Sequence, residues 1–127
     1  MRIVIVGAGK VGMALTQQLS QEHNVTVIDQ APRLINNIIN IHDVMGIGAS
    51  YEVQKEAEVD KAELLIATTS SDEINILACL VAKKLGVKHT IARIRNPEYE
   101  KQLRFMREEL GLSMAINPEK VAAREIA

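Results

Sequence analysis

The chain has 127 residues, 47% of them hydrophobic and 24% charged, with a formal net charge of −1, which is typical of one soluble globular domain. The balanced charge gives no electrostatic reason to expect a nucleic-acid partner, and two tyrosines and one phenylalanine are too few for a base-stacking platform. Cys79 is the only cysteine, so no internal disulfide can form, and no apolar run approaches the roughly 20 residues of a membrane span. We therefore expect a cytoplasmic protein without a signal peptide or a membrane-inserted segment.

The first predicted element is a buried strand over residues 2–6, which runs directly into the G-x-G-x-x-G turn Gly7-Ala8-Gly9-Lys10-Val11-Gly12. A helix over 10–21 follows. In such a turn Gly7 lets the chain reverse, Gly9 lets a pyrophosphate approach the backbone, and Gly12 lets the helix lie close to the strand. The first N–H groups and the positive dipole end of the helix would face the phosphates. The alternative is that the glycines only form a tight connection between strand and helix.

The second strand, over 25–28, ends in Asp29, 17 residues after Gly12. This spacing is close to that of a carboxylate that binds the ribose hydroxyls of a dinucleotide. A carboxylate would repel a 2′-phosphate, although Arg33 lies one helical turn further on. The alternative is that Asp29 caps the next helix, either instead of binding a ligand or in addition to it.

The remaining elements continue to alternate, each bounded by capping or turn residues. In order, they are a helix over 31–41, a strand over 44–48, a helix over 51–58 capped by Ser50, a strand over 64–68, a helix that follows Ser70 and runs to about Lys84, a strand over 89–95, a helix opened by Asn96-Pro97 and closed by Gly111, a strand over 112–116, and a last helix opened by Asn117-Pro118. Ser70 and Glu73 have the spacing of a capping box.

Apolar residues recur at helical spacing in four of these helices, and we expect each set to form the face that packs on the sheet. The sets are Val11, Leu15 and Leu19; Leu34, Ile35, Ile38 and Ile39; Ile74, Leu77, Val81 and Leu85; and Tyr99, Leu103, Met106 and Leu110. Alternating strands and helices predict a parallel sheet with helices on both faces. The expected fold is a doubly wound α/β Rossmann domain of three layers, α/β/α, with strand order 3-2-1-4-5-6.

The whole chain, 1–127, is expected to form this single domain. Its final helix, from about residue 118, has no stop signal, because neither Gly nor Pro follows it before the chain ends. We therefore expect either that the chain is part of something longer or that this helix finishes against a partner.

In this topology a ligand binds across the carboxyl ends of the first and fourth strands, where the winding direction reverses. Thr69 and Ser70 follow the fourth strand and could contact a ligand or only cap the next helix. Arg93 and Arg95 alternate along the fifth strand, so both point to one face and suit a phosphate or carboxylate. The alternative for the arginines is a salt bridge to Asp72, to Glu73 or to an acid of a neighbouring chain.

Other candidate chemistry is sparse. His23, His42 and His89 are scattered without metal-ligand spacing, and Cys79 lies inside a predicted helix, where a small core residue is expected. A dehydrogenase normally needs a second domain to hold its substrate, and the predicted fold uses all the residues. The sequence therefore predicts a protein that binds a nucleotide and is not an enzyme.

Several of these stretches also carry a family resemblance. They are 5–12 (IVGAGKVG), 27–29 (VID), 48–50 (GAS) with Val53 and 56–57 (EA), 67–75 (ATTSSDEIN), 91–99 (IARIRNPEY) and 116–119 (INPE). Through them the chain resembles, essentially from end to end, the regulatory nucleotide-binding domain of Trk-type potassium uptake systems, the TrkA family, also called the KTN or RCK N-terminal domain. The first stretch is common to dinucleotide-binding Rossmann domains, whereas 67–75 and 91–99 are far more specific.

The resemblance implies a cytoplasmic, non-catalytic subunit at the inner face of the membrane. It would bind NAD or NADH, or ATP or ADP, and pass the ligand state to a membrane potassium channel or transporter. At matching positions it implies that residues 7–11 hold phosphates, Asp29 holds the ribose, Thr69 and Ser70 line the second half-site, and Arg93 reaches a phosphate. It also implies a homo-oligomer, a dimer and then a ring, in which the last helix crosses to a partner. The resemblance further implies that the full family protein continues into a C-terminal domain, which we expect to be absent from this chain.

Two other classes of function stay open on the sequence alone. One is a small NAD-dependent oxidoreductase, or another Rossmann enzyme such as a methyltransferase with the same glycine turn. The other is a structural dimerisation module that has lost its site.

Overall fold

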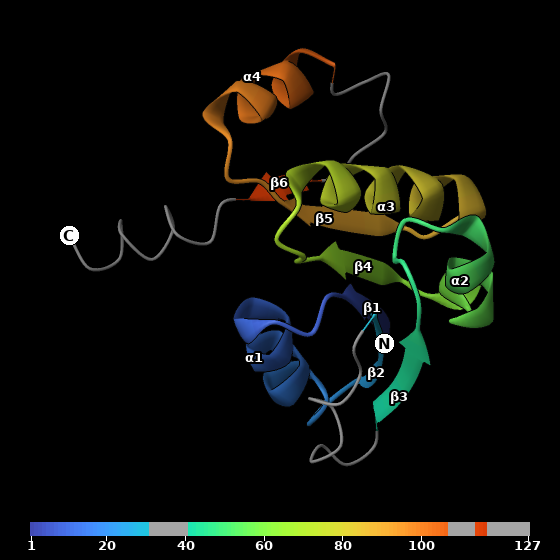
Figure 1. Ribbon diagram of the computed structural model, residues 1–127. Coiled ribbons are helices and arrows are strands. Elements are labelled where there is room, and N and C mark those ends of the chain that lie inside the picture. The colour runs from blue at the N-terminus through green and yellow to red at the C-terminus, as the bar shows by residue number, and fades with distance from the viewer. Residues whose placement is uncertain (31–40, 107–113, 117–127) are drawn as a thin grey trace.

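The computed structural model describes residues 1–30, 41–106 and 114–116 (Figure 1). Strands and helices alternate along these residues. They are β1 (Arg2–Val6), α1 (Lys10–Leu19), β2 (Asn24–Asp29), β3 (Ile41–Met45), α2 (Tyr51–Glu56), the 3-10 helix η2 (Val59–Lys61), β4 (Leu64–Ala67), α3 (Asp72–Leu85), β5 (His89–Arg93), α4 (Pro97–Phe105) and β6 (Met114–Ile116).

The strands form one parallel sheet in the order β3-β2-β1-β4-β5-β6, which confirms the predicted doubly wound topology. β1 lies at its centre, with Val6 paired to Ile28 of β2 on one side and to Ala67 of β4 on the other. The winding direction reverses between β1 and β4, so the carboxyl ends of these two strands form the switch point of the fold.

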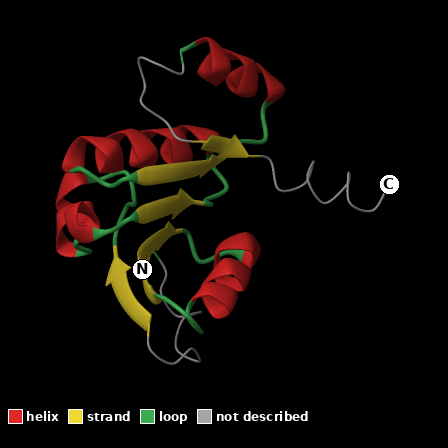
Figure 2. Cartoon of the chain, turned by 180° about the vertical axis from the view of Figure 1, so that it is seen from behind, coloured by secondary structure: helices red, strands yellow, loops and turns green. Residues whose placement is uncertain are grey.

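Side chains of β1 alternate between the two faces of the sheet. Ile3 and Ile5 belong to a core cluster on one face, against which Leu15 of α1 packs. Val4 and Val6 belong to a second cluster on the other face, which contains buried residues of α3 and contacts α2. α1 and α3 lie on opposite sides of the sheet (Figures 1 and 2), so the predicted three-layer architecture is confirmed.

α1 begins where predicted and ends at Leu19, two residues before the predicted end. Leu15 and Leu19 pack on the sheet as expected, but Val11 lines a cleft described below. The fully buried positions of the helix are Gly12 and Thr16, where small side chains let the helix approach the sheet closely.

The third strand lies three residues earlier in the sequence than predicted. β3 runs from Ile41 to Met45 and not over 44–48, and Ile41, predicted as the end of a helix, is its first residue. Gly46 leaves the strand with a φ of +153° while its N–H donates to the Asp29 carbonyl oxygen. β3 is an edge strand with exposed polar residues, so its apolar pattern was incomplete. The other residues of the helix predicted over 31–41 lie outside the described part of the chain.

α3 buries a different face from the one predicted. The buried residues are Asp72, Asn75, Ala78, Cys79 and Ala82, whereas Leu77 is half exposed. Small and polar side chains face the sheet, and the larger apolar side chains of the predicted stripe are only partly buried. The helix ends as predicted at Gly86, which adopts a φ of +106°.

The beginning of α3 also differs from the prediction. Its N-cap is Ser71, whose hydroxyl oxygen accepts a hydrogen bond from the N–H of Ile74, and not Ser70. The capping box predicted from Ser70 and Glu73 therefore does not form at this helix.

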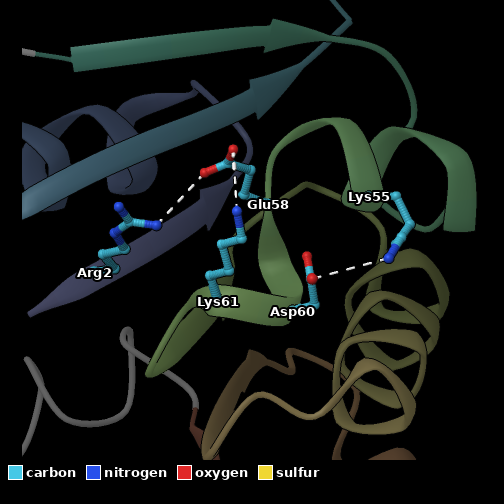
Figure 3. Close-up of polar contacts among 5 residues, drawn as sticks. All are labelled: Arg2, Lys55, Glu58, Asp60 and Lys61. Carbon is cyan, nitrogen blue, oxygen red and sulfur yellow. Dashed lines mark hydrogen bonds and ion pairs between the residues drawn. The ribbon is translucent and has the colours of Figure 1, made fainter.

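α2 is capped by Ser50, as predicted, but ends at Glu56. The chain leaves the helix because Glu58 adopts a left-handed conformation with a φ of 59°. The carboxylate of Glu58 lies 3.5 Å from Arg2 and 3.8 Å from Lys61 (Figure 3). Exposed ion pairs of this kind contribute little stability. Arg2 is the first residue of β1, so the pair that it forms lies at the end of the strand opposite the switch point.

Two strands end earlier than predicted. β4 ends at Ala67 and not at residue 68, and β5 ends at Arg93 and not at residue 95. α4 is opened by Asn96 and Pro97 as predicted, with the Asn96 side chain accepting from the N–H of Glu98.

α4 ends at Phe105, and within it the predicted stripe holds for Tyr99 and Leu103, which join the second core cluster. Leu110, Gly111 and the last helix from residue 117 lie outside the described residues, as do the first two residues of the predicted sixth strand.

Candidate functional site

A cleft of about 820 Å³ opens at the switch point of the sheet, at the carboxyl ends of β1 and β4. Ten of the eleven predicted site residues line it. They are Gly7, Ala8, Gly9, Lys10, Val11, Asp29, Thr69, Ser70, Arg93 and Arg95. The lining is completed by residues 6, 28, 30, 46–48, 68, 71 and 74.

Gly12 is the predicted site residue that does not line the cleft. A Cβ at this position would clash with the carbonyl oxygen of Gly7. Gly12 therefore acts through packing, because it lets α1 start directly against the glycine turn.

Gly7 and Gly9 have different structural roles in this turn. Gly7 has a φ of +105°, a left-handed conformation that favours glycine, and its N–H donates to the Ile28 carbonyl oxygen at 2.8 Å. A Cβ on Gly9 would meet no atom within 4 Å, so the backbone at this position borders open space. The turn thus places bare backbone at the edge of the cleft.

Among the residues that the structure describes, no side chain caps the amino end of α1. Gly9 is its N-cap residue and makes no side-chain capping bond, and the first turn holds no acidic residue. Among the α-helices in the described ranges, the other three are capped by the side chains of Ser50, Ser71 and Asn96. The first N–H groups of a helix have no intrahelical acceptor, so those of α1, together with its positive dipole end, are suited to bind an anion.

Asp29 is joined to the glycine turn by its side chain. Its Oδ2 accepts a hydrogen bond from the Ala8 N–H at 3.1 Å, and its Oδ1 accepts one from the Gln30 N–H at 2.7 Å. A carboxylate has about four acceptor positions, so both oxygens keep capacity for hydroxyl groups of a ligand. The two bonds fix the carboxylate beside the turn. Whether Asp29 also caps a helix over 31–40 concerns residues outside the described ranges.

Thr69 and Ser70 both reach the cleft but in different ways. The Thr69 hydroxyl lies 2.7 Å from Oδ1 of Asn75 and accepts from the Ser71 N–H at 3.2 Å, so it shapes the loop after β4. Ser70 is exposed at the rim of the cleft.

Arg93 and Arg95 both line the cleft, as their alternation predicted. Arg93 ends β5 and is only 8% exposed, whereas Arg95 is exposed. With Lys10, they place three cationic side chains around one carboxylate, that of Asp29, in the described lining. This charge balance favours an anionic ligand.

From the sequence, Asp72 was considered only as a salt-bridge partner of the arginines, and two further buried polar residues near the cleft, Asn75 and Gln54, were missed. Asn75 and Gln54 are both fully buried, and Asp72 is 9% exposed. Gln54 donates from Nε2 to the carbonyl oxygens of Gly48 and Ala78, which ties one wall of the cleft to α3. An amide or acid on the otherwise apolar buried face of a helix was the signal that could have revealed Asp72 and Asn75.

Other chemistry has little support in the described residues. They hold no group of three or more His, Cys, Asp or Glu residues placed to bind a metal ion. Cys79 is fully buried, as predicted, and burial raises the pKa of its thiol to about 12. The thiolate needed for nucleophilic attack is therefore suppressed. Within the described ranges, no helix combines the length and apolarity needed to cross a bilayer.

The sheet order and the glycine turn define a doubly wound domain of the Rossmann class. The family model of the TrkA-N domain matches residues 3–118, and the chain belongs to this family.

Curated relatives support the same assignment. The chain is 36% identical over 129 residues to a Trk system potassium uptake protein TrkA homolog from Archaeoglobus fulgidus, covering all of this chain and 30% of that protein. It is 38% identical over 133 residues to the Trk system potassium uptake protein TrkA of Haemophilus influenzae, covering 99% of this chain and 29% of that protein. The chain thus spans about a third of the length of these relatives.

Solved structures share the fold. The TrkA-N domain of the inner membrane protein ybaL from Escherichia coli has a TM-score of 0.82 at 21% identity, over 98% of this chain and 93% of that chain. The Kef CTD of Shewanella denitrificans in its AMP-bound form has a TM-score of 0.81 at 19% identity, over 99% and 77%. The GsuK channel bound to NAD has a TM-score of 0.75 at 23% identity, over 91% and 21%.

Proposed function

We propose that this chain is the nucleotide-sensing domain of a Trk-type potassium uptake system. It binds NAD or NADH, or ATP or ADP, in the cleft and passes the ligand state to a membrane potassium channel or transporter. Membership of the TrkA-N family and the names of the curated relatives support the potassium system. Structures of the same fold that hold AMP and NAD support an adenine nucleotide as the ligand class.

The observation that carries the proposal is the hydrogen bond between the Asp29 carboxylate and the Ala8 N–H. It joins a carboxylate suited to ribose hydroxyls to the backbone turn that opens the uncapped helix α1. A ribose and its phosphates are linked covalently, so one adenosine phosphate can contact the carboxylate and the neighbouring turn at once.

Roles for the lining residues follow from this placement. The turn of residues 7–11 holds the phosphates through the N–H groups at the start of α1, since those of Gly7 and Ala8 donate to Ile28 and Asp29. Asp29 holds the ribose, and Thr69 and Ser70 border the second half-site. Arg93 and Arg95 contact the outer phosphates, where Arg offers bidentate hydrogen bonds. Gly12 contributes by holding α1 close to the turn.

The domain senses its ligand without transforming it. The described residues around the cleft present a carboxylate, three cationic side chains and short hydroxyls, and the one cysteine is buried away from the cleft. A ligand changes an assembly only through its difference in affinity for two states, typically about 1–3 kcal/mol. We place the chain in a homo-oligomer on the cytoplasmic side of the membrane, held there by its transport partner.

Calorimetric titration of the full chain with ATP, ADP, NAD and NADH tests the proposal. Binding by the wild type is expected, with a loss of at least about tenfold in affinity for Asp29→Ala, since a hydrogen bond to a charged group is removed. Gly9→Trp is expected to abolish binding by filling the open space beside the turn. Asp43→Ala removes an exposed carboxylate from the neighbouring strand β3 and serves as the matched control. Wild-type affinity in both site variants would overturn the site.

A further inference from the structure

We infer that Asp72 and Asn75 are positioning residues of the nucleotide site. From the first turn of α3, they hold the backbone that carries Arg93 and Arg95, and thereby set how strongly the site distinguishes ligands by their number of phosphates. This inference rests on the proposed function, because it concerns the same cleft.

The segment from Arg93 to Asn96 leaves β5 along a path fixed at three consecutive points. Nδ2 of Asn75 donates to the Arg93 carbonyl oxygen at 2.8 Å. The next residue, Ile94, is fully buried in the core cluster beneath α3. The Asp72 carboxylate then accepts from the N–H groups of Arg95, at 3.0 Å, and Asn96, at 2.8 Å.

These contacts also explain why β5 stops at Arg93. The carbonyl oxygen of Arg93 and the N–H of Arg95 are the groups that would continue a strand ladder, and α3 binds both. The side chains of Arg93 and Arg95 lie two residues apart and both line the cleft, while Ile94 between them points into the core. A fixed backbone presents both guanidinium groups without the entropy cost of ordering a loop.

Asn75 links the same segment to the other wall of the cleft. Its Oδ1 accepts from the Thr69 N–H at 2.9 Å, and its Nδ2 also donates to the Thr69 carbonyl oxygen at 3.1 Å. One buried amide thus sets the separation between the loop after β4 and the end of β5. Displacing either partner alters the width of the cleft at the arginines.

Asp72 permits a test in which the electrostatic effect and the positioning effect predict changes in ligand affinity of opposite sign. Its carboxylate lies behind the arginines and does not line the cleft. Removing a negative charge near an anionic ligand should, by Coulomb's law alone, strengthen binding. Loss of positioning should weaken binding, and only for ligands whose outer phosphates reach the arginines.

The experiment measures the affinities of AMP, ADP and ATP for the full chain by calorimetry. Asp72→Asn is expected to lower the ratio of ATP to AMP affinity by about tenfold, equivalent to one charge-assisted contact, while AMP affinity stays within about twofold of wild type. Glu73→Gln removes the same charge from the same helical turn at an exposed residue and is expected to leave the ratio unchanged. Asp72→Ser, whose hydroxyl is too short to reach both N–H groups, repeats the comparison.

A double-mutant cycle with Arg95→Ala separates positioning from general stability. If Asp72 acts through the arginines, Asp72→Asn causes a smaller loss of ATP affinity in the Arg95→Ala background than in the wild type, because only Arg93 remains to be positioned. Four outcomes would overturn the inference and leave the proposed function intact. The first two are additive losses of ATP affinity in the double variant and an equal loss of affinity for AMP and ATP. The others are tighter ATP binding by Asp72→Asn and failure of both Asp72 variants to fold where Glu73→Gln folds. Absence of binding of all three nucleotides to the wild type would overturn both.

Discussion

Asn75 and Thr69 share three hydrogen bonds, which close the loop after β4 onto the first turn of α3. Oδ1 of Asn75 lies 2.9 Å from the Thr69 N–H nitrogen and 2.7 Å from the Thr69 hydroxyl, and Nδ2 lies 3.1 Å from the Thr69 carbonyl oxygen. Nδ2 also donates to the Arg93 carbonyl oxygen. The buried amide of Asn75 therefore donates two hydrogen bonds from Nδ2 and accepts two at Oδ1. Because the interior disfavours unpaired polar groups, this arrangement specifies asparagine at position 75.

Asn75→Asp tests that specification. A carboxylate can accept from Thr69, but it cannot donate to the carbonyl oxygens of Thr69 and Arg93, which it would repel. The free energy of unfolding should fall by about 2–4 kcal/mol, the cost of two buried acceptors left without donors. Chemical denaturation at pH 7 measures the loss. Asn24→Asp, the same substitution at an exposed residue, should change stability by less than about 0.5 kcal/mol. Equal effects at both positions would contradict the assignment.

Gly9 and Gly12 belong to one motif but should respond differently to alanine. Gly12→Ala places a Cβ against the Gly7 carbonyl oxygen and should cost about 3 kcal/mol of stability. Gly9→Ala adds a Cβ where no atom lies within 4 Å and should cost less than about 1 kcal/mol. Thermal unfolding of the two variants compares them directly. A Gly9→Ala variant as unstable as Gly12→Ala would show that the turn is packed differently.

Cys79 should make stability fall at alkaline pH. Burial raises the pKa of its thiol to about 12 from an ordinary value of 9.0. The unfolded chain releases this proton near pH 9 and the folded chain does not, so the contribution is complete below pH 9 and is lost as pH rises toward 12. Relative to Cys79→Ala, wild-type stability should fall by about 1.4 kcal/mol between pH 8 and 10. Parallel pH curves for the two proteins would refute the shifted pKa.

Glu58 carries the one positive φ found at a non-glycine residue of the described chain. Glu58→Gly relieves the left-handed strain, while Glu58→Ala removes the same ion pairs with Arg2 and Lys61 but keeps the strain. The glycine variant should therefore be more stable than the alanine variant by about 1 kcal/mol. Urea denaturation of the pair isolates the backbone effect, and an alanine variant of equal stability would argue against the strained conformation.

The order of elements was predictable because each central strand is a compact apolar run and each turn carries its own chemistry. Residues 2–12 specify a strand, a glycine turn and a helix, and Asp29 marks the end of the second strand. Prediction failed where tertiary contacts decide which residues form an element. β3 sits at the sheet edge and includes exposed His42 and Asp43, so its pattern did not indicate a buried strand.

The residues that line the cleft were predictable from the sequence, but the contacts that support them were not. Fold topology alone brings the glycine turn, Asp29, the loop after β4 and the end of β5 to one edge of the sheet. The hydrogen bonds of Asp72 and Asn75 depend on how α3 rotates about its axis. That rotation follows from small residues such as Ala78 and Ala82 facing the sheet, which hydrophobic periodicity does not weigh.

The claim that one adenosine phosphate spans the glycine turn and Asp29 is tested most directly by backbone amide NMR of the isotope-labelled chain during titration with ADP. Saturable shifts are expected at residues 7–11, at Gln30, whose N–H donates to Asp29, and at Thr69. The same titration of Asp29→Ala should show these shifts only at higher ADP concentration. Shifts confined to other residues, or none up to millimolar ADP, would contradict the account.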